Sequence, residues 1–169
     1  MKEIEVKFLV PSLDEFREKI KKMGGRLEWS GQETSFFFDT PGQELKKKGK
    51  FIRLRKWDGH SSSLTLKVRP KDGTGKYKIR DEYQTEVSDL EMVKKILGNL
   101  GFVQIFSYTK HREHWKLEGA CVELDNLGGQ SFIEIEGSKK AINQLAGKLG
   151  LDWSESTTKS YFDIAQKIK

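Results

Sequence analysis

The sequence predicts an α+β fold in which an eight-stranded antiparallel β-barrel is flanked by α-helices. Apolar and polar residues alternate in eight segments, as expected of strands, whose successive side chains point to opposite faces. Turn-prone stretches such as TPGQ, WDGH and NLGG separate these segments, and their spacing suits meandering hairpins better than parallel crossovers. Segments with helical periodicity lie between some of the strands, so we expect helices to flank the sheet.

The first predicted strand is the N-terminal stretch EIEVKFLV, residues 3–10, where charged residues alternate with Ile4, Val6 and Phe8. Seven more alternating segments follow along the chain. They are TSFFFDT (34–40), GKFIRLRKW (49–57), SSLTLKVRP (62–70), GKYKIRDEYQTEV (75–87), SYTKHREHWKL (107–117), ACVELDNL (120–127) and QSFIEIEG (130–137).

Two helices are expected to begin at serines. Ser12 with Glu15, and Ser88 with Glu91, have the S-x-x-E spacing of a capping box, which satisfies free backbone amides at a helix start. Each serine follows an acidic strand, so the chain repeats a strand–helix pattern.

Each of these helices is predicted to bury one apolar stripe and to end at glycine. The stripes are Leu13, Phe16, Ile20 and Met23 in the first helix, and Leu90, Val93, Ile96, Leu97 and Leu100 in the second. Gly24-Gly25 and Gly101 follow them as stop signals. A looser third copy of the strand–helix pattern covers residues 132–153.

The composition describes a soluble protein with an anionic partner. At 169 residues, we expect a single domain over residues 1–169. No apolar run approaches a membrane span and the N-terminus lacks a signal peptide, which predicts a cytoplasmic protein with no membrane partner. The single Cys121 and the scattered histidines lack zinc-ligand spacing, so carboxylates would have to hold any metal.

The formal net charge is +6 and the sequence pI is about 9.3, which favours nucleic acid, an acidic surface or a small phosphorylated molecule as partner. A nucleic-acid binder tends to collect Lys and Arg on one face, whereas here acids and bases are interleaved.

Charged side chains at positions i and i+2 occupy the polar face of nearly every predicted strand. In chain order the faces carry Glu3, Glu5 and Lys7; Arg53 and Arg55; Thr65, Lys67 and Arg69; Arg80, Glu82, Gln84 and Glu86; Lys110, Arg112 and His114; Glu123 and Asp125; and Glu134 and Glu136. If the apolar faces pack outward against helices, the charged faces line the barrel interior. Confined charges must pair, hold water or bind a ligand of both signs, because an unpaired charge there is costly.

A metal-bound polyphosphate is such a ligand. Lys and Arg pair with phosphate oxygens, while carboxylates hold Mg²⁺ or Mn²⁺, which prefer oxygen ligands. A Glu-x-Glu pair on one strand places two carboxylates about 7 Å apart on the same face, close enough to serve one metal or two neighbouring ones.

The stretch Glu3-x-Glu5-x-Lys7 resembles the E-x-E-x-K signature of the CYTH superfamily, the triphosphate tunnel metalloenzymes. This superfamily includes class IV adenylyl cyclases, thiamine triphosphatases and inorganic triphosphatases. Further motifs follow in the family's order over essentially the whole chain. They are FFFDT (36–40), FIRLR (51–55), LTLK (64–67), Arg80-x-Glu82, Lys110-x-Arg112, ELD (123–125), EIE (134–136) and SYFDIA (160–165). The short segment LGGQSFIEIEG (127–137) resembles the class IV cyclase branch most closely.

The resemblance implies a triphosphate tunnel that binds a triphosphate together with Mg²⁺ or Mn²⁺. The implied metal ligands are Glu3, Glu5, Asp125, Glu134 and Glu136, and the residues implied to hold the phosphates are Lys7, Arg53, Arg55, Lys67, Arg80, Lys110 and Arg112. Lys7, Glu134 and Glu136 are expected to act in catalysis. Glu82, Glu86 and Glu123 are expected to support the charged lining, although salt bridges to the basic residues explain Glu82 and Glu86 equally well. Gln84 stands where many relatives have an acid, which puts a metal role there in doubt.

Two chemistries suit such a site. In one, ATP is cyclised to cyclic AMP and pyrophosphate; in the other, thiamine triphosphate or inorganic triphosphate is hydrolysed. The lining residues do not reveal which way round the triphosphate lies. A non-catalytic polyphosphate- or nucleotide-binding module and a nucleic-acid binder are the alternatives from other classes, although the expected partner is a small triphosphate and no nucleic acid. A homodimer is the base-rate expectation.

Overall fold

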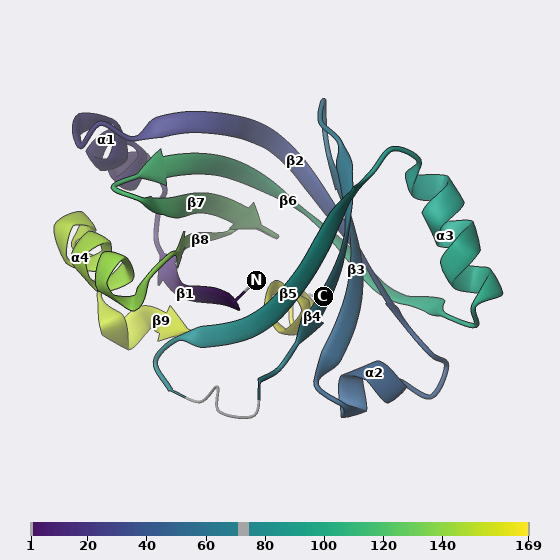
Figure 1. Ribbon diagram of the computed structural model, residues 1–169. Coiled ribbons are helices and arrows are strands. Elements are labelled where there is room, and N and C mark those ends of the chain that lie inside the picture. The colour runs from purple at the N-terminus through teal and green to yellow at the C-terminus, as the bar shows by residue number, and fades with distance from the viewer. Residues whose placement is uncertain (1, 71–74, 169) are drawn as a thin grey trace. The chain divides into compact units, whose positions relative to one another are not determined.

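The structure, a computed structural model, describes residues 2–70 and 75–168, which form two compact units (Figure 1). Of the described residues, the first unit contains residue 2 and residues 32–70 and 80–109, and the second contains residues 3–31, 75–79 and 110–168. Three strands are divided between the units, β2 (Arg26–Asp39), β5 (Lys78–Val87) and β6 (Val103–Leu117), and the first residue of β1 (Lys2–Val10) also belongs to the first unit. The single domain expected over residues 1–169 stays a prediction.

The strands of the first unit follow the order β5-β4-β3-β2-β6, with β3 (Lys50–Trp57) and β4 (Ser62–Val68) between the others. The pairs β2–β3, β3–β4 and β4–β5 are antiparallel, as the meander pattern predicted. A short helix, α2 (Glu44–Lys47), joins β2 to β3. Asp39 holds this helix in place, since its carboxylate accepts from the backbone N–H groups of Leu45 and Lys46 at 2.9 and 3.0 Å.

Helix α3 (Leu90–Asn99) covers the apolar face of this sheet. Leu97 and Val93 pack with Leu54 and its neighbours on the strands. The predicted stripe is wrong at Ile96 and Leu100, which are 50% and 68% exposed. The five apolar residues of the predicted stripe cover a wider part of the helix surface than one sheet can bury. Only some of them therefore reach the core.

The predicted capping box at the start of α3 is also wrong. The N-cap residue is Asp89, whose carboxylate accepts from the backbone N–H of Met92 at 2.8 Å, and Ser88 lies outside the helix. Asp and Ser cap equally well, so S-x-x-E spacing does not decide between adjacent residues. The helix ends as predicted, because Gly101 adopts a φ of 87°.

The strands of the second unit follow the order β2-β6-β7-β8-β1-β9. Besides β2 and β6, this sheet contains β1 (Lys2–Val10), β7 (Ala120–Leu127), β8 (Gln130–Glu136) and the two-residue β9 (Ser156–Thr157). Helices α1 (Asp14–Lys22) and α4 (Lys139–Leu149) pack on this sheet, and η1 (Trp153–Glu155) and α5 (Tyr161–Ala165) complete the chain.

The second unit holds the larger apolar core. Phe16 and Ile20 of α1, and Ile142, Leu145 and Leu149 of α4, are buried against strand residues that include Val6, Phe8, Val122 and Ile135. Complete burial of each Leu or Ile contributes roughly 1.5–3 kcal/mol. The apolar residues of these strands therefore face the helices, and the polar residues between them face the other side of the sheet.

The predicted capping box at Ser12 and Glu15 is wrong as well. Leu13 is the N-cap of α1 and offers no side-chain acceptor, while the Ser12 hydroxyl accepts from the backbone N–H of Asp14 at 3.3 Å. A capping box does occur at α5, where Ser160 and Asp163 satisfy each other's backbone N–H groups.

Several strand boundaries differ from those predicted: β5 begins three residues later, β4 ends two residues earlier, and the two-residue β9 was not predicted. β2 begins eight residues before the predicted position and β6 four residues before, because their first residues lack regular alternation and β2 contains Gly31. None of the helices within the described ranges has both the length and the apolar character needed to cross a membrane.

Candidate functional site

The strand register of the second unit places the predicted acids in rows on one face of the sheet. Glu5 on β1 lies directly opposite Glu136 on β8, and Lys7 lies opposite Glu134. Glu134 in turn lies opposite Glu123 on β7. Directly paired residues share a face, with Cβ atoms about 5 Å apart, so these side chains converge.

Lys7 joins two of these carboxylates. Its side chain is almost completely buried, and its Nζ lies 2.6 Å from both Glu5 Oε1 and Glu134 Oε2. Burial acts to lower the pKa of this ammonium, but Glu134 and Glu5 outweigh burial and raise the pKa. Lys78 on β5 contacts Glu5 Oε1 at 2.6 Å from another direction. Lys7 is therefore held as a cation between two acids.

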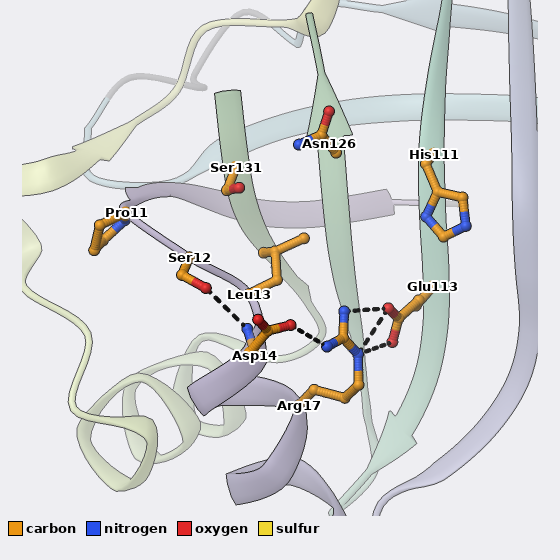
Figure 2. A pocket seen from close by; sticks show the side chains of 9 residues that line it. All are labelled: Pro11, Ser12, Leu13, Asp14, Arg17, His111, Glu113, Asn126 and Ser131. Carbon is orange, nitrogen blue, oxygen red and sulfur yellow. Dashed lines mark hydrogen bonds and ion pairs between the residues drawn. The ribbon is translucent and has the colours of Figure 1, made fainter. Parts of the chain in front are cut away.

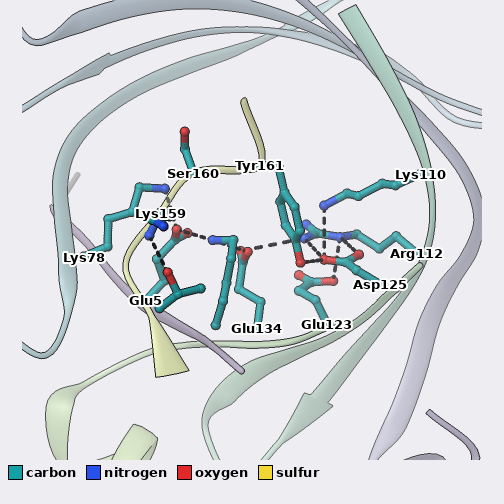
Figure 3. Close-up of polar contacts among 12 residues, drawn as sticks. Glu5, Lys78, Lys110, Arg112, Glu123, Asp125, Glu134, Lys159, Ser160 and Tyr161 are labelled. Atoms are coloured by element: carbon teal, nitrogen blue, oxygen red, sulfur yellow. Dashed lines mark hydrogen bonds and ion pairs between the residues drawn. The ribbon is translucent and has the colours of Figure 1, made fainter. Parts of the chain in front are cut away.

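Asp125 on β7 is fully buried and accepts four hydrogen bonds (Figure 3). Arg112 donates from Nε to Oδ1 and from Nη2 to Oδ2, both at 2.6 Å. Lys110 Nζ and the Tyr161 hydroxyl donate to Oδ2 at 3.1 and 2.5 Å. Burial, with the Asp125 and Glu134 charges, raises the pKa of Tyr161 far above its ordinary value, so the hydroxyl keeps its proton and remains a donor.

Arg112 also connects Asp125 to glutamates on β7 and β8. Its Nε lies 3.5 Å from Glu123 Oε2, and its Nη2 lies 3.7 Å from Glu134 Oε1. His114 extends this network: its Nδ1 lies 2.7 Å from Glu123 Oε1 and its Nε2 lies 3.4 Å from Glu28 Oε2. The hydrogen bond to Glu123 raises the pKa of His114 more than burial lowers it.

We call this region the mixed-charge cluster. Its members are Glu5, Lys7, Lys78, Lys110, Arg112, Glu123, Asp125, Glu134 and Tyr161.

The first unit carries a second charged region on β3, β4 and β5. Lys67 lies opposite Glu82 in the strand register, and its Nζ contacts Glu82 Oε2 at 2.8 Å. Arg55 Nε lies 3.4 Å from Glu33 Oε1, and Trp57 Nε1 donates to Glu33 Oε2 at 3.0 Å.

Arg53, between these pairs, lacks such a partner. Its side chain is buried, yet it forms no hydrogen bond or ion pair with another residue of ranges 2–70 and 75–168. Burial and the neighbouring Arg55 charge lower the pKa of its guanidinium. We call Arg53, Arg55, Lys67, Glu33 and Glu82 the arginine cluster.

Nearly all of the residues predicted from sequence lie in these two regions. Glu3 is buried on the same face of β1 as Glu5, Glu136 is half-buried beside it, and Arg80 is half-buried two residues before Glu82. Glu86 is exposed. Gln84 is exposed too and accepts from the Thr65 hydroxyl at 2.9 Å.

Sequence reasoning missed Lys78, Tyr161 and Glu33. Lys78 could have been found, because it lies two residues before Arg80 on the same strand and so shares its face. Tyr161 lies in the SYFDIA motif but has no charge. Glu33 gave no signal, since it precedes the alternating part of β2.

The acids of the second unit fit a hard divalent cation by type. Glu5 and Glu136 lie directly opposite each other, an arrangement that is unfavourable for like charges unless a cation lies between them. Carboxylate oxygens are the ligands that Mg²⁺ and Mn²⁺ prefer. Within the described ranges, no three or more His, Cys, Asp or Glu side chains are already gathered as a metal site. Glu3, Glu5, Glu134 and Glu136 are the residues that would hold such an ion.

A separate pocket of about 460 Å³ opens in the second unit where the start of α1 meets the sheet (Figure 2). His111 and Glu113 line it and alternate along β6 with Lys110 and Arg112, so the pocket lies on the other face of that strand. Glu113 is engaged there by Arg17, whose Nη2 and Nε lie 2.7 and 2.9 Å from Oε1. The pocket therefore does not belong to the mixed-charge cluster.

Comparison with known proteins finds a matching domain family and a protein of similar sequence. A model of the CYTH domain family matches residues 1–161. A protein of Methanocaldococcus jannaschii named "putative adenylate cyclase" is 26% identical over 145 residues, which cover 85% of this chain and 81% of that protein.

Two solved structures extend the comparison. The X-ray structure of a "putative adenylate cyclase" from Vibrio parahaemolyticus has a TM-score of 0.84 and 22% identity, and the match covers 97% of each chain. A "putative adenylyl cyclase" from Hippeastrum, described as having a dominant triphosphatase activity, has a TM-score of 0.73 and 20% identity over 99% of this chain and 96% of that one. The Vibrio structure confirms the predicted fold class, an α+β fold with an eight-stranded closed antiparallel β-barrel and flanking helices.

Proposed function

The chain belongs to the CYTH domain family, and from this premise we propose that it is a divalent-metal-dependent enzyme acting on a triphosphate. In the form that we favour, it resembles class IV adenylyl cyclases and converts ATP to cyclic AMP and pyrophosphate. The names of the relatives from M. jannaschii and V. parahaemolyticus support this form.

The buried guanidinium of Arg53 is the observation that carries the proposal. A buried charge that forms no hydrogen bond or ion pair is costly, and burial together with repulsion by Arg55 outweighs the attraction of Glu33 and Glu82. A phosphate oxygen pair would satisfy the planar guanidinium with two parallel hydrogen bonds, which is the geometry that Arg provides and Lys does not. A polyanion bound here would compensate the buried charge of Arg53 and reduce its repulsion by Arg55. The arginine cluster therefore suits a phosphate chain.

The acids of the second unit would bind the divalent metal. Glu3, Glu5, Glu134 and Glu136 would hold Mg²⁺ or Mn²⁺, which when bound would neutralise negative charge on the phosphates. Lys7 keeps its proton between Glu5 and Glu134, so it would present a fixed positive charge to the substrate. In cyclisation the ribose 3′-hydroxyl attacks the α-phosphorus and pyrophosphate leaves.

A triphosphatase is the second candidate, and the activity described for the Hippeastrum protein favours it. Here water attacks the terminal phosphorus, and orthophosphate and a diphosphate are released. The same cationic and acidic residues would serve both reactions, because stabilising charge on the phosphates is common to them. Thiamine triphosphate and inorganic triphosphate are the substrates to compare with ATP.

The test is to incubate the purified protein with Mg²⁺ or Mn²⁺ and, separately, with ATP, thiamine triphosphate or inorganic triphosphate, and to resolve the products by phosphorus NMR. Cyclic AMP with pyrophosphate would establish the cyclase. Orthophosphate with a diphosphate would establish the triphosphatase, and the preferred substrate would identify its physiological role. Absence of turnover on all three substrates would contradict both candidates.

Two variants separate an enzyme from a binding module. Glu134→Gln should abolish turnover but retain triphosphate binding, because the arginine cluster is unchanged. Arg69→Ala is the matched control, since Arg69 is an exposed cation just after β4 and should change neither property. A wild type that bound RNA or DNA with steep salt dependence and did not bind triphosphate would instead favour the nucleic-acid binder.

A further inference from the structure

We propose that Tyr161 is a positioning residue that fixes Asp125 as the anchor of Lys110 and Arg112, and that Asp125 is not a metal ligand in this protein. The inference rests on the proposed function and deepens it, because it divides the acids of the mixed-charge cluster into two groups with different roles.

The hydrogen bonds of Asp125 are the first argument. A carboxylate has about four lone-pair sites, and Asp125 accepts from four donors: Arg112 Nε, Arg112 Nη2, Lys110 Nζ and the Tyr161 hydroxyl. Its side chain is fully buried, so water does not compete for these sites. Three of these donors share Oδ2 and Arg112 Nε binds Oδ1, so a metal ion at Asp125 would have to lie close to the positive charges of Lys110 and Arg112, which repel a cation. Glu134 differs, since its Oε1 has only the 3.7 Å contact with Arg112.

The aromatic ring of Tyr161 is the second argument. Lys110 Nζ lies 4.0 Å and Lys7 Nζ 4.8 Å from the ring centroid, so the ring faces two of the proposed phosphate-binding ammonium groups. The ring also contacts Phe132, at 5.6 Å in an edge-on arrangement. One side chain therefore contacts an acid through its hydroxyl and two cations through its ring. Figure 3 shows Tyr161 with Asp125 and Lys110.

The chain fixes Tyr161 from both sides in sequence. It is the first residue of α5, whose start is held by the reciprocal hydrogen bonds of Ser160 and Asp163. After α5, Ile168 packs on the turn between β7 and β8, where a Cβ on Gly128 would come within 2.5 Å of the Ile168 side chain. Glycine at residue 128, whose φ is 57°, thus lets the Ile168 side chain lie close against this turn.

The consequence is preorganisation of the basic pair. Asp125 holds Lys110 and Arg112 side by side, so both cations are oriented before a phosphate binds. A pair that is already oriented loses less side-chain entropy when the ligand binds. Tyr161 would therefore raise the affinity for the phosphate chain. The metal would instead be bound by Glu3, Glu5, Glu134 and Glu136.

The first experiment compares Tyr161→Phe, Tyr161→Leu and the wild type by calorimetric titration with inorganic triphosphate in the absence of metal. Tyr161→Phe keeps the ring and loses the hydroxyl, and should weaken binding about tenfold, as expected for one hydrogen bond to a charged group. Tyr161→Leu loses the ring as well and should bind more weakly still. Tyr77→Phe is the matched control, because Tyr77 packs on Trp153 away from Asp125, and it should bind as the wild type does.

The second experiment measures Mn²⁺ affinity by electron paramagnetic resonance and KM and kcat with the preferred substrate. Tyr161→Phe and Asp125→Asn should leave the Mn²⁺ affinity within about twofold of wild type, whereas Glu134→Gln should weaken it tenfold or more, as loss of a ligand does. Tyr161→Phe should raise KM with little change in kcat, which a general loss of folded protein would not do. Thermal unfolding of each variant checks that it is folded.

Three outcomes would overturn the inference. Unchanged triphosphate affinity in folded Tyr161→Phe, with normal binding by the wild type, would remove only the role of Tyr161. Loss of Mn²⁺ affinity in folded Asp125→Asn, equal to the loss in Glu134→Gln, would make Asp125 a metal ligand. A wild type that binds no triphosphate at all would remove the proposed function and this inference together.

Discussion

The two charged regions of the molecule differ in how their cations are compensated. In the mixed-charge cluster every cation has a carboxylate within 3.1 Å: Lys7, Lys78, Lys110 and Arg112 contact Glu5, Glu134 or Asp125. In the arginine cluster the distances lengthen from 2.8 Å for Lys67 to 3.4 Å for Arg55, and Arg53 forms no ion pair within the described ranges. Both regions are buried, yet one satisfies its own charges and the other leaves positive charge unmatched.

This difference separates a contribution to stability from a contribution to binding. Ion pairs in the mixed-charge cluster compensate the desolvation of their members, so removing one member should destabilise the fold. For Arg53, burial and the Arg55 charge outweigh the attraction of Glu33 and Glu82, so its removal should relieve the folded state and harm ligand binding instead. Variants that delete one charge in each region therefore test the comparison directly.

The largest effect is expected for Lys7→Met. This change removes the ammonium that lies 2.6 Å from both Glu5 and Glu134, and leaves the two carboxylates buried on adjacent strands. The free energy of unfolding should fall by about 3 kcal/mol, as expected when one partner of a buried ion pair is removed. Urea unfolding measures it.

Lys21→Met is the control for that loss. Lys21 pairs with Glu18 on the surface of α1, with both side chains more than half exposed, so its removal should cost less than about 1 kcal/mol. Equal losses of unfolding free energy in the two variants would show that the buried ion pairs of Lys7 stabilise the fold no more than a surface ion pair does.

Arg53→Met should have opposite effects on stability and binding. The unliganded protein should be as stable as wild type or more so, because a buried, uncompensated charge is replaced by an apolar side chain of similar length. Triphosphate affinity should fall roughly 10- to 100-fold, the effect of losing hydrogen bonds to a charged group. Thermal unfolding with and without inorganic triphosphate measures both. A destabilised variant with unchanged affinity would reverse the roles assigned to the two regions.

The smallest effect concerns His114, at the edge of the mixed-charge cluster. The hydrogen bond to Glu123 raises its pKa above the ordinary 6.5, so the protonated imidazole is favoured in the folded state. Its contribution to stability should be fully present below a pH of about 6.5 and should be lost as the pH rises through the folded-state pKa.

His114→Gln is neutral at every pH and isolates that contribution. The difference in free energy of unfolding between wild type and His114→Gln should be largest in acid and should shrink as the pH rises. Urea unfolding at a series of pH values measures it. A difference that grows toward alkaline pH would mean that the neutral imidazole is the form stabilised by Glu123.

The sequence by itself determined the strands and which of their residues share a face. Alternation is a local property, so the charged positions on β1, β3, β7 and β8 followed from period two alone. The family motifs E-x-E-x-K, FIRLR and EIE were legible for the same reason. Helix caps were less determined, since Ser88 and Asp89 are adjacent residues of equal capping ability, and only the backbone conformation selects Asp89.

Only the tertiary structure decided which charges are matched. Lys7, Arg53 and Lys110 look alike in sequence, as basic residues on the polar faces of strands, yet Lys7 lies between two acids, Lys110 shares Asp125 with Arg112, and Arg53 has no partner in the described ranges. Tyr161 joined them from a helix 36 residues beyond Asp125. Pairing depends on strand register and on distant segments, and a one-dimensional pattern contains neither, because alternation gives the face of a residue and not its neighbour across the sheet.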